Sequence, residues 1–331
     1  MALRTTALLS IILASLSAAR ADDLKLSLPV DCVIGDTCFI QQYVDVDPGP
    51  GARDYRGGSA VYNKHKGTDI RVRTLADAAR GVKVLAAAPG KVLGIRDGVA
   101  DRVVFSARDR ERIRDIYCGN GVLIDHGDGW HTQYCHLRRN SVLVQRGDQV
   151  ERGQVLGLVG YSGLAQFPHL HIAVRRHGRT LDPFTSKPIT GAEDAGQPVS
   201  LWDETARQQL KYREGRMLYS GFATGAVEPA DVLKRLPDED AIASNSPALV
   251  AYGWWINLQK GDRVVTRLTG PGGRISSHTS EPLNRAKAQF VQFSGKPRPT
   301  GGWPAGIYRS DVAIIRDGRQ IMKQRRSLEI R

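Results

Sequence analysis

Two histidines, His169 and His171, stand on either side of Leu170 and are followed by Ile-Ala-Val. Apolar, partly β-branched residues favour a strand, in which alternate side chains point to the same face. The two imidazoles would therefore project side by side while Leu170 points into a core. Such a pair can bind a metal, or one imidazole can bind it while the other transfers protons. The alternative is a polar strand face that happens to carry two histidines.

A second polar pair, His65 and Asp69, lies earlier in the chain with a spacing of four residues. Gly67 between them argues against a helix, and the alternation in residues 70–73 is typical of a strand. We therefore expect a turn that leads into a strand. Taken alone, this pair is weak evidence for a site, because surface pairs of this kind are common.

A further histidine, His136, lies in a segment with the pattern of a hairpin. Residues 122–124 are its first expected strand, residues 126–129 its turn and residues 130–137 its returning strand. Strict alternation places four side chains of the returning strand on one face: Trp130, Thr132, Tyr134 and His136. His131 points to the opposite face, so it is assigned no role beside His136.

Short strands with glycine-rich turns recur through the first part of this 331-residue chain, which contains 35 glycines. Further strand candidates lie at residues 39–44 and on both sides of Pro89-Gly90. A basic run over residues 100–117 is expected to form an exposed loop or a short helix. This pattern predicts a mainly β protein whose first domain is an antiparallel sheet.

The composition changes after residue 184, and residues 188–200 have the pattern of a linker. Residues 201–331 contain one histidine, His278, and no catalytic constellation. Strand candidates between Gly/Pro turns predict a small β-sandwich, after a short helix near residues 203–216. The candidates are residues 249–258, 262–268, 288–294 and 306–316. The aromatic residues Trp254, Trp255, Trp303 and Tyr308 are expected in its core, although exposed ones would be candidates for binding sugar or a partner.

The first 21 residues have the pattern of a cleavable signal peptide. Arg4 precedes a short apolar core, and Ala19-Arg-Ala21 fits a small-x-small cleavage site. An uncleaved anchor helix is the alternative. We expect export, with residues 22–59 as an N-terminal extension and residues 60–187 as the first domain. No later apolar run approaches the length of a membrane span.

The four cysteines fit an oxidising compartment, where disulfides persist. Cys32 and Cys38 would close a tight loop, while Cys118 and Cys135 would join two strand-like runs. We favour these pairings among the three that four cysteines allow. A zinc site made of cysteines is the alternative, but it lacks the usual CxxC spacing.

The formal net charge is +13, and loss of Arg4 and Arg20 with the signal removes two positive charges and leaves +11. So basic an exported chain suggests an anionic partner, such as cell-wall polymer, membrane phosphate or nucleic acid, although solubility alone is a sufficient reason for the charge. Nucleic-acid binding lacks a recognisable motif and interleaved aromatic and basic residues.

The histidine-containing segments together closely resemble the M23 family of zinc metallopeptidases, the lysostaphin or LytM type. The resemblance covers roughly residues 60–184 and excludes the C-terminal third. Five segments carry it in order: His65-Lys-Gly-Thr-Asp69, Gly121-Val-Leu-Ile-Asp-His-Gly-Asp-Gly129, Tyr134-Cys-His-Leu137, Gly157-Leu-Val-Gly-Tyr-Ser-Gly163 and His169-Leu-His171. The chain departs from the family at Cys135 and in the basic insertion before Cys118.

The resemblance implies a strongly twisted antiparallel LytM-like sheet with a groove that holds one Zn²⁺. The metal ligands would be His65, Asp69 and His171, and the two other active-site histidines would be His136 and His169. Three protein ligands leave one position for a water, which zinc activates. One of the two other histidines would transfer protons and the other would stabilise the oxyanion; which does which stays open.

These residues predict an exported zinc endopeptidase that hydrolyses peptide cross-links of bacterial peptidoglycan. The substrate class follows from the resemblance, and the expected partners are peptidoglycan peptide stems. The expected location is the periplasm of a Gram-negative cell, or otherwise the secreted fraction, and the expected bond is D-alanyl to meso-diaminopimelate. Glycyl bonds or a protein substrate are alternatives for the bond. A non-catalytic regulator of other wall hydrolases is the alternative function. Residues 24–60 could also cover the groove.

Overall fold

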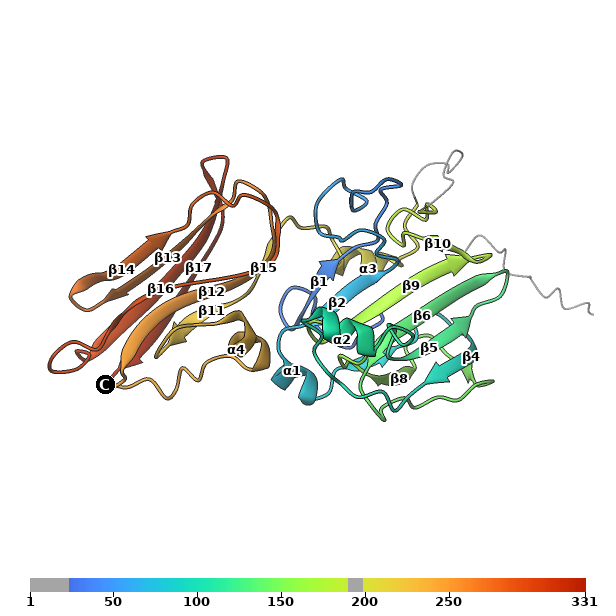
Figure 1. The fold of residues 1–331 in the computed structure, drawn as a ribbon, viewed down its shortest axis with the longest axis horizontal. Helices are drawn as coiled ribbons and strands as arrows, with labels where there is room; N and C mark the ends of the chain where they lie inside the picture. Colours follow the sequence, from blue (N-terminus) through green and yellow to red (C-terminus); the bar gives the residue numbers. More distant parts are fainter. Residues whose placement is uncertain (1–23, 190–198) are drawn as a thin grey trace, which may run out of the picture.

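The computed structural model describes residues 24–189 and 199–331. Two β domains lie side by side, with the first on the right and the second on the left in Figure 1. The prediction of a mainly β protein with antiparallel sheets is confirmed. The expected signal peptide, residues 1–21, and most of the expected linker, residues 188–200, lie outside the described residues. No helix in the described part is long and apolar enough to cross a membrane.

The first domain is built on an eight-stranded sheet in the order β1-β2-β9-β6-β5-β4-β7, with β10 paired to the C-terminal end of β9. Its strands are β1 (Cys38–Gln42), β2 (Thr68–Val72), β4 (Gly90–Arg96), β5 (Asn120–Asp125), β6 (Trp130–Leu137), β7 (Gln149–Val150), β9 (His169–Arg176) and β10 (Arg179–Leu181). A separate pair joins β3 (Lys83–Leu85) to β8 (Val155–Leu158). All of these pairings are antiparallel, so neighbouring strands are joined by turns and loops.

Strand β9 lies between β2 and β6 and carries His169 and His171. Leu170, Ile172 and Val174 are buried in the main core, as the alternation predicts. His169 and His171 project from the opposite face. Asp69 of β2 stands directly beside His171 in the register. The strand pairing therefore brings residues about a hundred positions apart in the chain onto one face of the sheet.

Two short helices flank this sheet. Helix α1 (Leu75–Ala79) begins at Thr74, whose side chain accepts a hydrogen bond from the backbone N–H of Asp77 in a capping box. Helix α2 (Ala107–Arg112) has the same arrangement at Ser106 and buries none of its residues. The basic run therefore forms a short exposed helix, which is one of the two structures expected for it.

Both favoured disulfides are present. Cys32 joins Cys38 at the start of β1, and Cys118 joins Cys135 of β6. Residues 24–37 run along the first domain, where Leu26 and Val30 belong to its core. The segment before the sheet is thus packed against it rather than separate from it.

The second domain consists of two antiparallel sheets. A three-stranded sheet has the order β11-β12-β15, and a four-stranded sheet has the order β14-β13-β16-β17. The strands are β11 (Arg216–Ala223), β12 (Ala248–Leu258), β13 (Arg263–Gly270), β14 (Gly273–Thr279), β15 (Lys287–Pro297), β16 (Gly306–Arg316) and β17 (Arg319–Ile330). Helices α3 (Glu204–Gln209) and α4 (Pro229–Lys234) precede β11 and β12.

All four aromatic residues singled out in the sequence are buried, Trp255, Trp303 and Tyr308 in the core of this sandwich and Trp254 in a cluster shared with the first domain. Trp254, Trp255, Trp303 and Tyr308 are each no more than 5% exposed, so the packing role is confirmed. The four expected strands correspond to β12, β13, β15 and β16. Strands β11, β14 and β17 were not expected, because the many charged and polar residues of β14 and β17 obscure the alternation.

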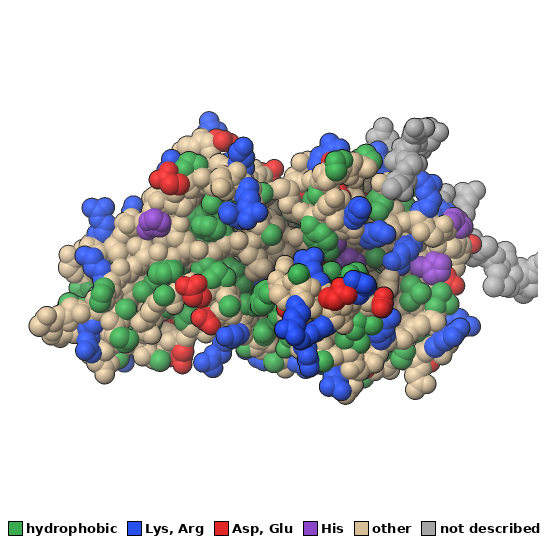
Figure 2. All heavy atoms as spheres, in the orientation of Figure 1, with side chains coloured by type: hydrophobic (Ala, Val, Ile, Leu, Met, Phe, Trp, Pro, Cys, Tyr) green, Lys and Arg blue, Asp and Glu red, His purple; other side chains and the backbone are tan. Residues whose placement is uncertain are grey.

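The two domains are packed against one another. Phe167 of the first domain shares a buried cluster with Trp254 of the second. The side-chain amide of Gln41 in β1 donates to the carbonyl of Ala288 at 2.7 Å, and the Gln41 carbonyl accepts from the Asn257 side chain at 2.9 Å. On the face in Figure 2, lysine and arginine side chains are distributed over both domains, so the positive charge is not confined to one of them.

Candidate metal centre

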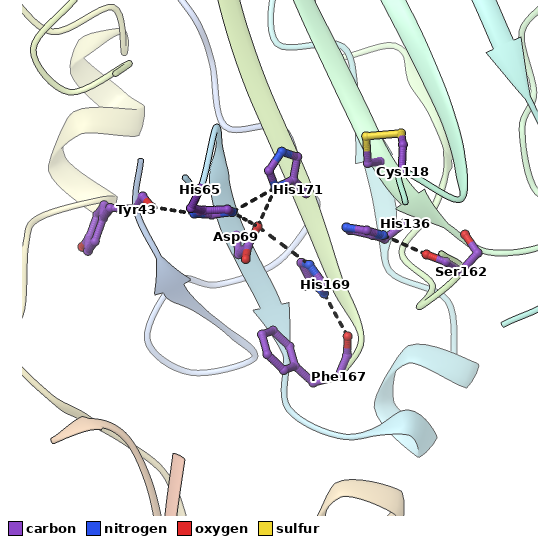
Figure 3. A network of polar contacts seen from close by, with 10 residues as sticks. Tyr43, His65, Asp69, Cys118, His136, Ser162, Phe167, His169 and His171 are labelled. Carbon is purple, nitrogen blue, oxygen red and sulfur yellow. Dashed lines mark hydrogen bonds and ion pairs between the residues drawn. A yellow bond between two sulfur atoms is a disulfide. The ribbon is translucent and has the colours of Figure 1, made fainter. Parts of the chain in front are cut away.

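The turn before β2 orients the first predicted ligand, His65. Its Nδ1 donates to the backbone carbonyl of Tyr43 at 2.6 Å, which leaves Nε2 free of a proton in the neutral ring. Nε2 then points at Asp69 and His171 (Figure 3). A backbone carbonyl behind a histidine is the usual way in which proteins fix the tautomer of a metal ligand. The ring is buried, as such a fixed ligand should be.

His65, Asp69 and His171 present one nitrogen, one oxygen and one nitrogen to a common point. Asp69 Oδ1 is 2.8 Å from His171 Nδ1 and 3.1 Å from His65 Nε2, and the two nitrogens are 3.1 Å apart. Ligand atoms of a tetrahedral zinc site, each about 2.1 Å from the metal, lie about 3.3 Å apart. The three side chains therefore fit a zinc ion in both chemistry and spacing, and they form a possible metal site.

The charges inside this cluster favour an ionised carboxylate. Burial raises the pKa of Asp69, but the neighbouring His65 and His169 charges and the hydrogen bonds from His171 and His65 outweigh it and hold the pKa well below its usual range. Burial lowers the pKa of His65, but Asp69 beside it leaves that pKa raised. The site is thus built around a buried negative charge that attracts cations.

His136 reaches the same face of the sheet through a break in the strand, which corrects the face expected for it. Tyr134 points into the core, where its hydroxyl accepts from the Ala87 N–H at 2.8 Å. The register shifts between Asn120 and Gly121, opposite His136, and His136 has a φ of +65°. This bulge turns His136 away from the core face that it was predicted to share with Tyr134.

Backbone carbonyls fix the tautomers of His136 and His169 as well. Nδ1 of His136 donates to the Ser162 carbonyl at 2.8 Å, and Nδ1 of His169 donates to the Phe167 carbonyl at 2.9 Å. Their rings are 4.5 Å apart (Figure 3). Burial, followed by the nearby histidines, lowers the pKa of His136 well below its usual range. Burial also lowers the pKa of His169 despite the nearby Asp69, so both rings are suited to being neutral.

The structure brings together all five residues predicted for the site and leaves the other histidines outside it. His126 bonds Pro89 and Thr132 at the hairpin turn, and His131 lies near Asp125. His177 and His278 lie in other turns and strands. Neighbours of the site that sequence reasoning missed are Tyr62, whose ring is 4.5 Å from that of His65, and Arg71, the partner of His169 in the register.

A model of peptidase family M23 matches residues 63–183 of the chain. This part of the chain is similar to the M23 peptidases. The match includes all five residues of the candidate site and ends at the last residues of the first domain, so the second domain lies outside it. The resemblance described from the sequence is thereby confirmed for this part of the chain.

Two relatives are peptidoglycan DD-endopeptidases of Vibrio cholerae serotype O1. ShyA is 42% identical over 66 residues, which are 20% of this chain and 15% of ShyA. ShyB is 29% identical over 138 residues, which are 41% of this chain and 26% of ShyB. The chain thus matches about a quarter or less of the length of either relative.

Among solved structures, a zinc-containing peptidase from Vibrio cholerae is 26% identical, and the match covers 44% of this chain and 39% of that chain. Its TM-score is 0.28, which is too low for the two structures to be compared in detail.

Proposed function

We propose that this protein is a zinc endopeptidase that hydrolyses peptide cross-links of peptidoglycan. The observation that carries the proposal is that one ligand atom each of His65, Asp69 and His171 points to a common position. Two further histidines with fixed tautomers lie beside it. A peptidase of this family needs a metal held by three protein ligands and proton-transferring groups next to it. The described residues supply both sets on one face of the sheet.

His65, Asp69 and His171 would hold the zinc. When bound, zinc would supply a Lewis acid that polarises the scissile carbonyl and lowers the pKa of a water. The chain's part is to hold the Nδ1 proton of His65 on the Tyr43 carbonyl, so that Nε2 faces the metal point, and to keep the Asp69 carboxylate ionised. Asp69 is almost completely buried, which keeps water from competing for its charge.

One of His136 and His169 would transfer the protons. Each ring has its Nδ1 proton directed at a backbone carbonyl, so in the neutral form its Nε2 carries a lone pair. A neutral ring with a lowered pKa can accept a proton from the attacking water and return it to the leaving amine. Which ring does so stays open, because their surroundings are alike in both respects.

The substrate class is proposed from the relatives, whose names state that they are peptidoglycan DD-endopeptidases. The net charge of +13 is compatible with peptides rich in carboxylates. The two disulfides support an oxidising location outside the cytoplasm, and we propose the periplasm.

The purified protein incubated with Gram-negative sacculi tests the proposal. Wild type should release split cross-linked dimers, identified by mass, and a chelator or His171→Ala should abolish release. His278→Ala, which changes an exposed histidine of the sandwich, serves as the matched control and should leave release unchanged. If the zinc-loaded wild type released no products, the peptidase proposal would be overturned in favour of a non-catalytic regulator.

A further inference from the structure

Arg71 is a fully buried cation next to the candidate site. Its side chain is 0% exposed, and no carboxylate in residues 24–189 or 199–331 lies within ion-pair distance of it. A buried charge without a counter-charge is costly, so the protein must compensate it in another way. The compensation comes from both domains.

Hydrogen bonds to Arg71 come from three elements. One guanidinium nitrogen, Nη1, donates to the side-chain oxygen of Gln41 in β1 at 2.8 Å and to that of Gln289 in β15 at 3.0 Å. The other, Nη2, donates to the Arg73 carbonyl at 3.2 Å. A single nitrogen therefore joins the edge of the first sheet to the sandwich. With the 3.5 Å bond from Nε to the Val72 carbonyl, four of the five guanidinium N–H groups are used, and the side chain is buried away from solvent.

Two aromatic rings enclose the guanidinium. Its central carbon is 4.5 Å from the ring centre of Phe167 and 5.0 Å from that of Trp254. Phe167 belongs to the first domain and Trp254 to the sandwich, so the cation is held between the two domains. Cation–π contacts are stronger where water is excluded, as it is here.

The same cluster contacts His169, one of the two candidates for proton transfer. Arg71 is the partner of His169 in the pairing of β2 with β9. The Phe167 ring is 4.7 Å from the His169 ring, and the Phe167 carbonyl accepts the Nδ1 proton of His169. The residue that fixes the tautomer of His169 is thus itself held in place by Arg71 and Trp254.

We propose that Arg71 is a positioning residue through which the C-terminal sandwich fixes His169, so that the sandwich is part of the catalytic unit. The proposal rests on the proposed peptidase function. The alternative is that the sandwich only targets the enzyme to an insoluble cell wall. A targeting domain would matter for sacculi alone, whereas a positioning domain also matters for a small soluble substrate.

Two glutamines of strand β15 give a matched pair of variants. Gln289→Ala removes the hydrogen bond from the sandwich to Arg71. Gln292→Ala removes the hydrogen bonds that its side-chain nitrogen donates to the Val264 carbonyl and the Thr266 hydroxyl, both within the sandwich. Arg71→Lys keeps the charge but cannot bridge two glutamines and stack between two rings. The three variants separate the interdomain contact from the stability of the sandwich.

The first measurement is hydrolysis of a soluble cross-linked muropeptide dimer. We expect Gln289→Ala to lower kcat about 10-fold and Arg71→Lys about 100-fold, with KM within about 2-fold, because small displacements of a reacting group have effects of this size. Gln292→Ala should lower the melting temperature and leave kcat unchanged. Unchanged kcat in Gln289→Ala and Arg71→Lys, or a defect seen only with sacculi, would overturn the proposal.

The second measurement does not depend on activity. In protein labelled at histidine ¹³Cε1, the His169 cross-peak, assigned with His169→Gln, should shift in Gln289→Ala and stay in place in Gln292→Ala. If wild type hydrolysed nothing, the proposed function would fail while this measurement still tested the coupling. No shift in Gln289→Ala would show that the sandwich does not act on His169.

Discussion

Asp69 of the peptidase domain and Asp262 of the sandwich are both buried aspartates, but their partners differ. Asp262 receives two hydrogen bonds from Arg316, at 2.8 and 2.9 Å, and one from the Gln259 N–H at 2.8 Å. Within residues 24–189 and 199–331, Asp69 has no arginine or lysine within ion-pair distance, and its neighbours are imidazoles.

The difference separates a structural charge from a functional one. Arginine keeps its proton at all ordinary pH values, so the Asp262 pair is permanently neutralised. Imidazoles can lose their protons, so the neighbours of Asp69 can exchange protons for a metal cation. A buried carboxylate whose neighbours are imidazoles can therefore take a metal cation in place of the imidazole protons. The buried carboxylate with a permanent partner belongs to the domain without a catalytic constellation.

The first prediction exchanges the two carboxylates for amides. Asp69→Asn should abolish stoichiometric zinc binding and lower hydrolysis at least about 1,000-fold, because an amide is a poor metal ligand. Asp262→Asn should retain zinc but lower the free energy of unfolding by about 3 kcal/mol, since it leaves the Arg316 charge without its partner. Mass spectrometry measures the zinc content, and urea unfolding in the presence of a chelator measures the free energy of unfolding. Loss of zinc in Asp262→Asn would contradict the distinction.

The second prediction separates ligands from proton-transferring groups within the peptidase domain. His136→Gln and His169→Gln should each keep one zinc per chain and lower kcat by about 100- to 10,000-fold, the range for general acid–base groups. His171→Ala should instead lose the zinc. Metal content and kcat are measured on the same samples. If either glutamine variant lost zinc, that histidine would belong among the ligands.

Much of this distinction was accessible from the sequence. The His-x-His pair and its strand gave the correct face for His169 and His171, because alternation along β9 is regular. The order of the motifs gave the remaining residues through the family resemblance. Alternation gave the wrong face for His136, because its positive φ interrupts the strand. No residue type in the sequence indicates this φ.

Contacts between the domains could not be predicted from the sequence. In the sequence, Arg71 is an ordinary polar residue of an alternating strand. Nothing in the neighbouring residues indicates that Gln289, over 200 residues away, contacts it. The four-stranded sheet was found only in part for a related reason. Strand β17 carries many polar residues, so its pairing with β16 rather than its own pattern makes it a strand.

The third prediction compares the two disulfides. Replacing Cys118 and Cys135 by serine should cost about 3 kcal/mol and replacing Cys32 and Cys38 about 2 kcal/mol, because the loops they close differ in length. The first bond also lies beside the catalytic face, and the Cys118 carbonyl accepts from the His136 N–H at 2.8 Å. Its loss should therefore lower kcat several-fold, while loss of Cys32–Cys38 should not. Equal kcat in the two double variants would contradict a role at His136.

The last prediction concerns a third buried aspartate, Asp182, which forms no ion pair with an arginine or a histidine in the described part of the chain. Burial raises its pKa to about 6, although it accepts hydrogen bonds from the Phe184 N–H and the Thr185 hydroxyl. Its proton is thus bound more tightly in the folded chain than in the unfolded one. The stability that this proton contributes is present below about pH 4 and is lost as the pH rises to about 6.

Asp182→Asn should remove this pH dependence and retain an acceptor for the Phe184 N–H. The difference in free energy of unfolding between wild type and variant should therefore change by about 2 kcal/mol between pH 4 and pH 7, in favour of the variant at the higher pH. Urea unfolding at intervals across this range measures it. Asp317→Asn, at an exposed turn, is the control for the substitution itself. If the difference in free energy of unfolding between wild type and Asp182→Asn did not change with pH, water would have to reach this carboxylate in the folded chain.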